Sequence, residues 1–272
     1  MQSKVIRNLK ITNRFKYYKV TNKHENHHGF QYIDGLNILK GKFENDPDNS
    51  CGSGGFYFTT LEYIPKFYSY GTNIRQISLP ESDPDFLMVK DPSGSKWRAN
   101  KIILGEKYSL LDPSTYKKLN LDITEYKYLI DYASENGRLD TLEWWKKSDI
   151  KLIYSHLAID LASGNGHSNI LDWWKKSGLE LKYKNSAIKR ASANGHSIIL
   201  DWWKNSGLEL KYTNDAIDNA SMNGHIDVLE WWKNSGLEIK YTNDAIIWAS
   251  KNGQSNILGW WLKSDLVNDC LE

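Results

Sequence analysis

The sequence predicts two domains of different class: an α+β domain at the N-terminus, followed by an all-α array of five helix pairs. Two observations support this division. Eleven of the twelve tryptophans lie after residue 140, whereas all six prolines lie at or before Pro113. In the second half, Asn-Gly pairs recur every 29 residues, and a fixed period of this length is typical of a repeat array. The glycines of these pairs are Gly137, Gly166, Gly195, Gly224 and Gly253.

The change in composition sets the expected domain boundaries. We expect the N-terminal domain over residues 1–110 and a linker over residues 111–120. Five repeats of 29 residues should follow over residues 121–265, and a C-terminal tail over residues 266–272.

The first 110 residues have the composition of β-strands. Four segments are rich in β-branched and aromatic residues and are bounded by Gly, Pro, Asn or Asp, as strands commonly are. They are Phe15–Val20, Gly54–Thr60, Asn73–Leu79 and Ala99–Leu104. The sequence LEYIPKFYSYG, which lies between the second and third segments, is expected to hold a short helix.

Each repeat is expected to form two short helices. In the fourth repeat, Ala216 and Ala220 lie one turn apart on the first helix. Gly224 should end that helix, because glycine readily adopts the left-handed conformation found after helix ends. The second helix carries Trp231 and Trp232 in line with its aliphatic residues. We therefore expect both tryptophans of every pair to face the core, against the small residues of the first helices. An aromatic ligand site is the alternative.

The repeated pattern A-I-x-x-A-S-x-N-G-H-x-x-V-L-E-W-W-K-x-S-G-L-E-I resembles an ankyrin repeat in its paired alanines, Gly-His turn and apolar second helix. The segment Asn214–Ile217 replaces the family's Thr-Pro-Leu-His tetrapeptide, and the stretch from Gly236 to Gly253 is shorter than in the family. The resemblance implies an ankyrin-like solenoid whose β-hairpins are reduced or absent. It also implies that the turn histidines bond to neighbouring backbone and hold no metal. These are His167, His196 and His225.

The five repeats differ most at three positions of the first helix, which lie opposite the alanine stripe. Together these positions should form one continuous face, and a variable face on a repeated scaffold suits protein recognition. The alternative is a solvated face without a partner. The residues predicted to bind a protein partner are Leu161, Lys189, Arg190, Asp218, Asn219, Met222, Ile247 and Trp248.

Two patches of the N-terminal domain raise the question of a bound ion or cofactor. His24, His27 and His28, together with Cys51, match no structural zinc spacing. The glycine-rich sequence SCGSGGFYFTT lacks the motifs of nucleotide-binding loops. We expect neither a metal nor a cofactor.

The order HHG, GLN, GGFYF and then two tyrosines resembles in outline the nicotinamide-binding half of ADP-ribosyltransferases. The resemblance implies that His28 contacts a ribose and that Tyr68 or Tyr70 stacks on nicotinamide. An NAD-using enzyme, with the repeats as its targeting module, is therefore the alternative function. After Ile77, no segment matches the family's catalytic glutamate motif.

The combination of a GLN…GGFYFT core and an ISLP strand with Asn-Gly-His repeats is similar to ankyrin-like proteins of giant DNA viruses of amoebae. This resemblance implies a viral protein expressed in the host cell, with the cytoplasm as the expected location. The two cysteines fit a reducing compartment. The expected function is that of a scaffold or adaptor, and a passive virion component is a further alternative.

Composition limits the expected partners. No apolar run approaches the roughly 18 residues of a membrane helix. The net charge of +2 provides no general attraction to nucleic acid. The sequence therefore predicts a protein partner, which it does not identify, and neither a membrane nor a nucleic acid.

Overall fold

The computed structural model describes residues 17–50, 52 and 54–266. The chain divides into two compact units, Met1–Tyr126 and Lys127–Glu272. The segment expected to be a linker forms helix α1 (Pro113–Leu119) at the end of the first unit. The Asp112 side chain accepts a hydrogen bond from the Ser114 N–H at 2.9 Å, and proline occupies the first turn, as at many helix starts.

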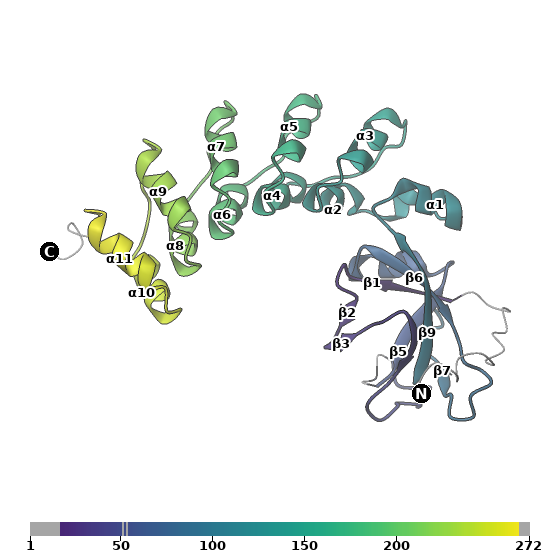
Figure 1. Cartoon of the computed structure of the whole chain (residues 1–272). Coiled ribbons are helices and arrows are strands. Elements are labelled where there is room, and N and C mark those ends of the chain that lie inside the picture. The colour runs from purple at the N-terminus through teal and green to yellow at the C-terminus, as the bar shows by residue number, and fades with distance from the viewer. Residues whose placement is uncertain (1–16, 51, 53, 267–272) are drawn as a thin grey trace. The chain divides into compact units, whose positions relative to one another are not determined.

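The first unit is built on a seven-stranded antiparallel sheet with the order β4-β9-β6-β1-β5-β8-β7. Strands β1, β5, β6, β7 and β9 are labelled in Figure 1. The four predicted strands overlap β1, β5, β6 and β9, although Phe15 and Lys16 lie outside the described residues. The prediction missed β4, β7 and β8, which are too short to show alternation. The strands are β1 (Tyr17–Thr21), β4 (Gly35–Ile38), β5 (Phe56–Thr60), β6 (Asn73–Ser78), β7 (Met88–Lys90), β8 (Trp97–Ala99) and β9 (Lys101–Ser109).

A hydrophobic cluster of the first unit lies on one face of this sheet. Phe56 and Phe58 alternate along β5, so both side chains point to the same face and are buried there. The short helix expected after β5 is present as the 3₁₀ helix η2 (Ile64–Tyr70), which contacts β1. The other buried members of the cluster are Tyr32, Ile77, Leu79, Ala99, Ile102 and Leu104.

The second unit contains ten described α-helices in five pairs. Figure 1 shows them in two rows, in which each first helix packs on the next first helix and each second helix on the next second helix. The first helices are α2 (Leu129–Glu135), α4 (Leu157–Gly164), α6 (Ser186–Ala193), α8 (Asp215–Met222) and α10 (Asp244–Lys251). The second helices are α3 (Leu139–Lys147), α5 (Ser168–Lys176), α7 (Ser197–Asn205), α9 (Ile226–Asn234) and α11 (Ser255–Lys263).

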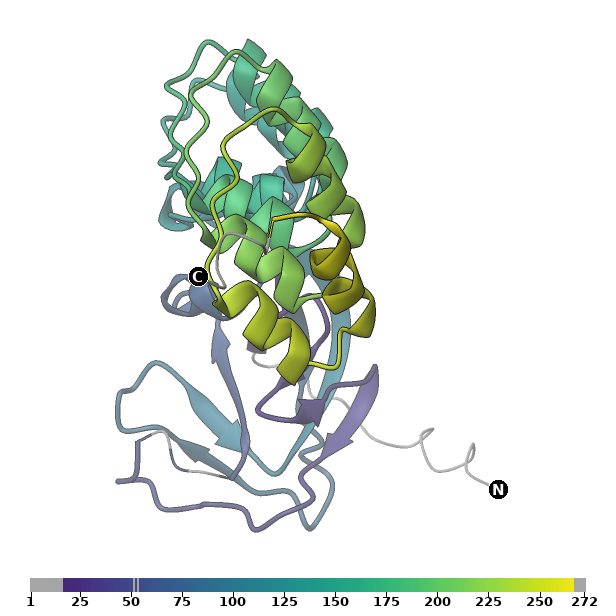
Figure 2. The same ribbon diagram turned by 90° about the vertical axis from the view of Figure 1, so that its left-hand side faces the viewer.

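The connections between pairs are extended loops, seen along one side of the second unit in Figure 2. No strand occurs between residues 110 and 266, all of which the structure describes. Projecting hairpins are thus absent from this stretch, as the short spacing between repeats predicted. The expected tail lies outside the described residues from residue 267 onward. Within the described part of the chain, no helix combines the length and the apolar character that crossing a membrane requires.

The two tryptophans of each pair have different environments. The second is buried throughout, and Trp203 is only 1% exposed. Its indole Nε1 donates to the Ser163 hydroxyl, on the first helix of the preceding pair, at 3.1 Å. Trp174, Trp232 and Trp261 make the same bond to the equivalent serines at 3.1–3.2 Å.

The first tryptophan of each pair is only half-buried, except for Trp173. The prediction that both tryptophans face the core was therefore wrong for this position. Adjacent helical residues point about 100° apart, so a narrow core stripe accommodates one of them fully. The Trp202 Nε1 instead donates to the Asp172 carboxylate of the preceding second helix at 2.8 Å. Trp231 does the same with Asp201 at 2.7 Å.

The turn histidines His167 and His196 connect neighbouring repeats through backbone, as predicted. The His167 Nε2 bonds to the Glu135 carbonyl oxygen at 3.1 Å, and Asn165 donates to the same oxygen at 2.7 Å. The His167 ring also covers Gly137, where an added Cβ would lie 3.0 Å from the ring. A glycine at this turn thus serves both the left-handed backbone and the close approach of the histidine.

His196 should make the array sensitive to acid. Burial, and then the neighbouring His167 and His225, lower the pKa of His196 below its ordinary value of 6.5. The unfolded chain therefore binds the proton more readily than the folded chain. The free energy of unfolding should consequently fall as the pH drops below about 6.5 toward the lowered pKa.

The matched variant is His196→Gln, because Gln254 already occupies the equivalent position in the last repeat. Urea unfolding at pH 7.5 and pH 5.5 should show a smaller loss of stability on acidification for the variant than for the native chain. Equal losses of stability in the two proteins would show that His196 is not the source of the acid sensitivity.

Candidate functional site

The predicted partner-binding residues lie on the first helices and differ in exposure. Arg190 is exposed, Ile247 is 45% exposed and Trp248 is 43% exposed. Lys189 is half-buried and donates to the Asp215 carboxylate, at the start of the next first helix, at 2.8 Å. The remaining half-buried residues are Leu161, Asn219 and Met222.

Asp218 has a different role from the predicted one. It is buried, and its carboxylate accepts hydrogen bonds from the Thr242 N–H and hydroxyl at 2.9 and 2.7 Å. Asp131 binds Ser155 in the same way at 2.9 and 2.6 Å. The carboxylate at this position therefore holds the loop that leads into the next pair, so we exclude Asp218 from the partner-binding surface. Comparing the repeats revealed a change in residue type at this position, but not that the aspartates are buried.

The equivalent Asp160 is fully buried, and it accepts from the Lys184 N–H at 3.0 Å and from the Ser186 hydroxyl. Burial raises the pKa of the Asp160 carboxyl above its ordinary value, and these two hydrogen bonds oppose the increase. The aspartate thus bears a desolvation cost that its hydrogen bonds partly offset.

The variable positions of neighbouring first helices touch. An added Cβ on Gly164 would lie 2.9 Å from the Cβ of Arg190 on the next helix. Within α10, the Lys251 amine also contacts a variable position, because it lies 4.5 Å from the centre of the Trp248 ring. We use the name first-helix face for the surface formed by Leu161, Arg190, Asn219, Met222, Ile247 and Trp248.

The first unit contains a cavity of about 620 Å³ that is partly open to solvent. Its walls come from β1 and β5, from a small two-stranded ribbon and from the end of η2. The ribbon consists of β2 (Asn26–His27) and β3 (Phe30–Gln31). His28 and Gly29 form its turn with φ angles of 49° and 77°, as a type I′ turn requires. Aromatic residues that line the cavity are Tyr18, Phe30, Tyr32, Phe56, Tyr57, Phe58, Phe67 and Tyr70.

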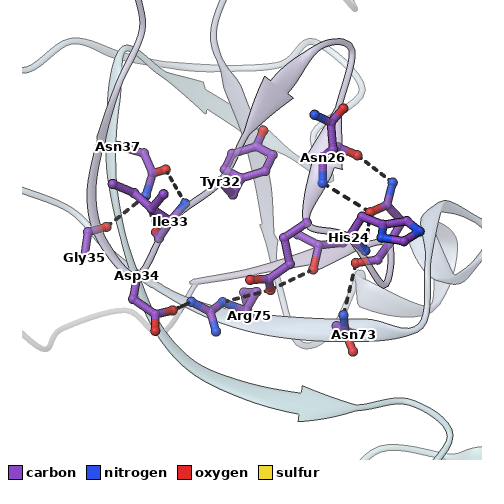
Figure 3. Close-up of polar contacts among 12 residues, drawn as sticks. His24, Asn26, Tyr32, Ile33, Asp34, Gly35, Asn37, Asn73 and Arg75 are labelled. Atoms are coloured by element: carbon purple, nitrogen blue, oxygen red, sulfur yellow. Dashed lines mark hydrogen bonds and ion pairs between the residues drawn. The ribbon is translucent and has the colours of Figure 1, made fainter.

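Polar contacts fasten the ribbon to the sheet (Figure 3). Asn73 on β6 donates to the Asn22 carbonyl at 3.1 Å, and the Asn22 side chain accepts from the Asn26 N–H at 3.2 Å. Arg75, also on β6, pairs with Asp34 beyond the ribbon, and this hydrogen bond and charge lower the pKa of the Asp34 carboxyl. The segment that carries the histidines is thus held at both ends.

The floor of the cavity carries a buried lysine. Lys19 on β1 donates to the Tyr57 carbonyl at 2.9 Å, and its amine lies 5.0 Å from the centre of the Tyr32 ring. Burial lowers the pKa of Lys19 to about 8. Burial, the charge of Lys19 and the adjacent His28 lower the pKa of His27 to about 4. Among the described residues that line the cavity there is no aspartate or glutamate.

The ADP-ribosyltransferase resemblance pairs His28 with either Tyr68 or Tyr70, and only the second of these pairs lines the cavity. His28 and Tyr70 both line it, and His27 lies between them, 4.3 Å from the His28 ring and 5.7 Å from the Tyr70 ring. Tyr68 is not among the lining residues; it is buried, with its ring 4.9 Å from that of Tyr126. The pairing of His28 with Tyr68 is therefore not formed.

Sequence reasoning missed Lys19, because alternation along β1 places it on the opposite sheet face from Tyr18 and Val20, and only the folded chain shows that this face is buried as well. Cys51, considered with the histidines as a metal ligand, lies outside the described residues. Within the described part of the chain, no three His, Cys, Asp or Glu side chains are grouped so as to hold a metal ion.

Comparison with known proteins identifies relatives in Acanthamoeba polyphaga mimivirus. One, named "Putative ankyrin repeat protein", is 42% identical over 130 residues, which are 47% of this chain and 64% of the relative. A second of the same description is 47% identical over 104 residues, 38% of this chain and 31% of the relative. An uncharacterized mimivirus protein is 46% identical over 101 residues, 37% of this chain and 72% of that protein.

The chain belongs to the ankyrin-like repeat proteins of giant viruses. It spans less than two thirds of the length of the two relatives that carry the ankyrin repeat description. No family model matches the chain. Ankyrin-like repeat proteins commonly mediate protein interactions, which directs attention to the first-helix face rather than to a catalytic centre.

Proposed function

We propose that this ankyrin-like repeat protein is an interaction scaffold or adaptor, whose five helix pairs form a solenoid that binds a protein partner through the first-helix face. The observation that carries the proposal is the exposure of large side chains on this face. Trp248 and Ile247 on α10 are more than two fifths exposed, and Arg190 is exposed on α6. Tryptophan and arginine are enriched among residues that dominate protein interfaces.

Contacts between repeats give the proposal further support. Trp203, His167 and Asp218 each bond to a neighbouring repeat. These bonds involve none of the residues of the first-helix face. Residues of that face can therefore differ between repeats without loss of the bonds that hold the array together. We further propose that the interaction takes place in the cytoplasm of the infected host cell, a proposal motivated by the viral origin of the relatives.

The double variant Arg190→Ala/Trp248→Ala should bind the partner at least about 100-fold more weakly than the native chain. A 100-fold loss of affinity corresponds to about 2.7 kcal/mol of binding free energy. Two interface anchors that contribute about 2 kcal/mol each would together exceed this amount. The full chain would be used to capture proteins from amoebal lysate, and a protein identified by mass spectrometry would be titrated by calorimetry.

The matched control removes one cation and one exposed apolar side chain from the second helices, in the variant Lys175→Ala/Ile198→Ala. Ile198 is 74% exposed, so this change should leave both folding and affinity as they are. Equal weakening by the two double variants, or captured protein that neither variant affects, would contradict binding through the first-helix face.

A further inference from the structure

The cavity of the first unit has the size and walls of a small-molecule site. Its volume of about 620 Å³ falls within the range of roughly 300–1,000 Å³ that is usual for such sites. Phe30 and Phe56 meet edge to face, with ring centres 4.7 Å apart, and Phe30 contacts Tyr32 at 5.0 Å. Aromatic walls of this kind favour a planar apolar group as the occupant.

The buried lysine gives the cavity a positive charge. The pKa of Lys19 is about 8, so most of the amine is protonated at neutral pH. An ammonium group has three N–H donors. The hydrogen bond described for it is the one to the Tyr57 carbonyl. A buried cation of this kind is normally compensated by an anion.

The described walls supply no such anion, since neither aspartate nor glutamate lines the cavity. Lys96 at the wall is also cationic, and it has its own contact with Asp91 at 3.5 Å. The field of Lys19 reaches the rim, where it contributes to the lowered pKa of His27. The cavity therefore combines an aromatic lining with an uncompensated positive floor.

We infer that this cavity binds a small aromatic anion, with its ring among Phe30, Tyr32, Phe56 and Tyr70 and its acidic group on the Lys19 ammonium. A carboxylate, sulfonate or phosphate would accept the charge-assisted hydrogen bonds that the lysine offers. The stacked rings of neutral His27 and the adjacent His28 would lie at the rim. This role is independent of the interaction through the first-helix face.

Two fluorescent probes that share a ring system distinguish binding of the rings by the aromatic walls from binding of the acidic group by Lys19. Anilinonaphthalene sulfonate is an aromatic anion, whereas N-phenylnaphthylamine has the same rings without the sulfonate. Both should bind the native full chain. The variant Lys19→Met, which keeps the length of the side chain but removes its charge, should weaken the sulfonate probe about tenfold or more. The same variant should change the affinity of the neutral probe less than about twofold.

The control Lys117→Met removes an exposed lysine from α1 and should affect neither probe. If Lys19→Met weakened both probes equally, or if the sulfonate probe failed to bind the native chain, the inference would be overturned. Far-UV circular dichroism of each variant would accompany the titrations.

A measurement on the native chain avoids reliance on a variant that fails to fold. Reductive methylation with formaldehyde modifies accessible lysine amines and is located by peptide mass spectrometry. Saturating sulfonate probe should protect Lys19 from methylation at least about fivefold while leaving Lys117 unchanged, because the acidic group would cover the amine. Binding of the probe without protection of Lys19 would place it elsewhere and reject the site.

Discussion

Replacing Trp203 by alanine should lower the free energy of unfolding of the repeat array by about 3–5 kcal/mol, as large aromatic truncations in cores do. The side chain is 1% exposed and packs on Tyr183, with ring centres 4.8 Å apart. Its removal would also leave the buried Ser163 hydroxyl without the indole donor. Urea unfolding followed by circular dichroism at the helical band would measure the loss.

The neighbouring Trp202→Ala is the matched control. Trp202 is half-buried, and its bond to Asp172 lies at the surface. We therefore expect a loss of about 1–2 kcal/mol, the sum of one exposed hydrogen bond and partial burial. Similar losses for the two variants would mean that both tryptophans belong to the core, contrary to their described environments.

Replacing Gly71 by alanine should destabilise the first unit by about 3 kcal/mol, at the upper end of ordinary overpacking costs. Gly71 lies between η2 and β6. An added Cβ would lie 2.1 Å from the Thr21 carbonyl oxygen and 2.6 Å from the Asn22 nitrogen. These are backbone atoms at the end of β1, so no side-chain rotation relieves the clash, and β1 must move away from η2.

Hydrogen exchange of peptides from β1 and β6 in the full chain would report this change without interference from the repeats. Exchange through global opening of the unit should accelerate about 100-fold, which corresponds to about 3 kcal/mol. Gly41→Ala is the control, because an added Cβ there meets no atom within 4 Å. If Gly71→Ala exchanged no faster than Gly41→Ala, the proposed clash would be refuted.

The architecture of the second unit was predictable because each repeat contains its own helix-ending signals. The Asn-Gly pair ends the first helix, and the spacing to the next repeat left too few residues for a hairpin. The first unit was less predictable, because the edge strand β7 and its neighbour β8 are each three residues long. Helix α1 was also missed, although Asp112-Pro113 is an ordinary helix start.

The candidate sites were predicted only in part, because sequence variation does not report burial. Arg190, Ile247 and Trp248 are exposed as expected, whereas Asp218 satisfies the backbone of the following loop. The cavity depends on strands and a ribbon that meet only in the folded chain. His28 was predicted there, but Lys19 was not, since its burial results from tertiary packing.

The bonds that tie one helix pair to the next have a consequence for how such chains change in length. Each of them reaches only the adjacent pair: the indole of Trp203 finds Ser163, Asn194 finds the Gly164 carbonyl at 2.7 Å, and Asp218 finds Thr242. A duplicated stretch of 29 residues would therefore bring with it every donor and acceptor that its neighbours require. Gain or loss of whole repeats in the gene would leave the bonds between the remaining repeats intact. Viral lineages could therefore lengthen or shorten the array without further changes in sequence.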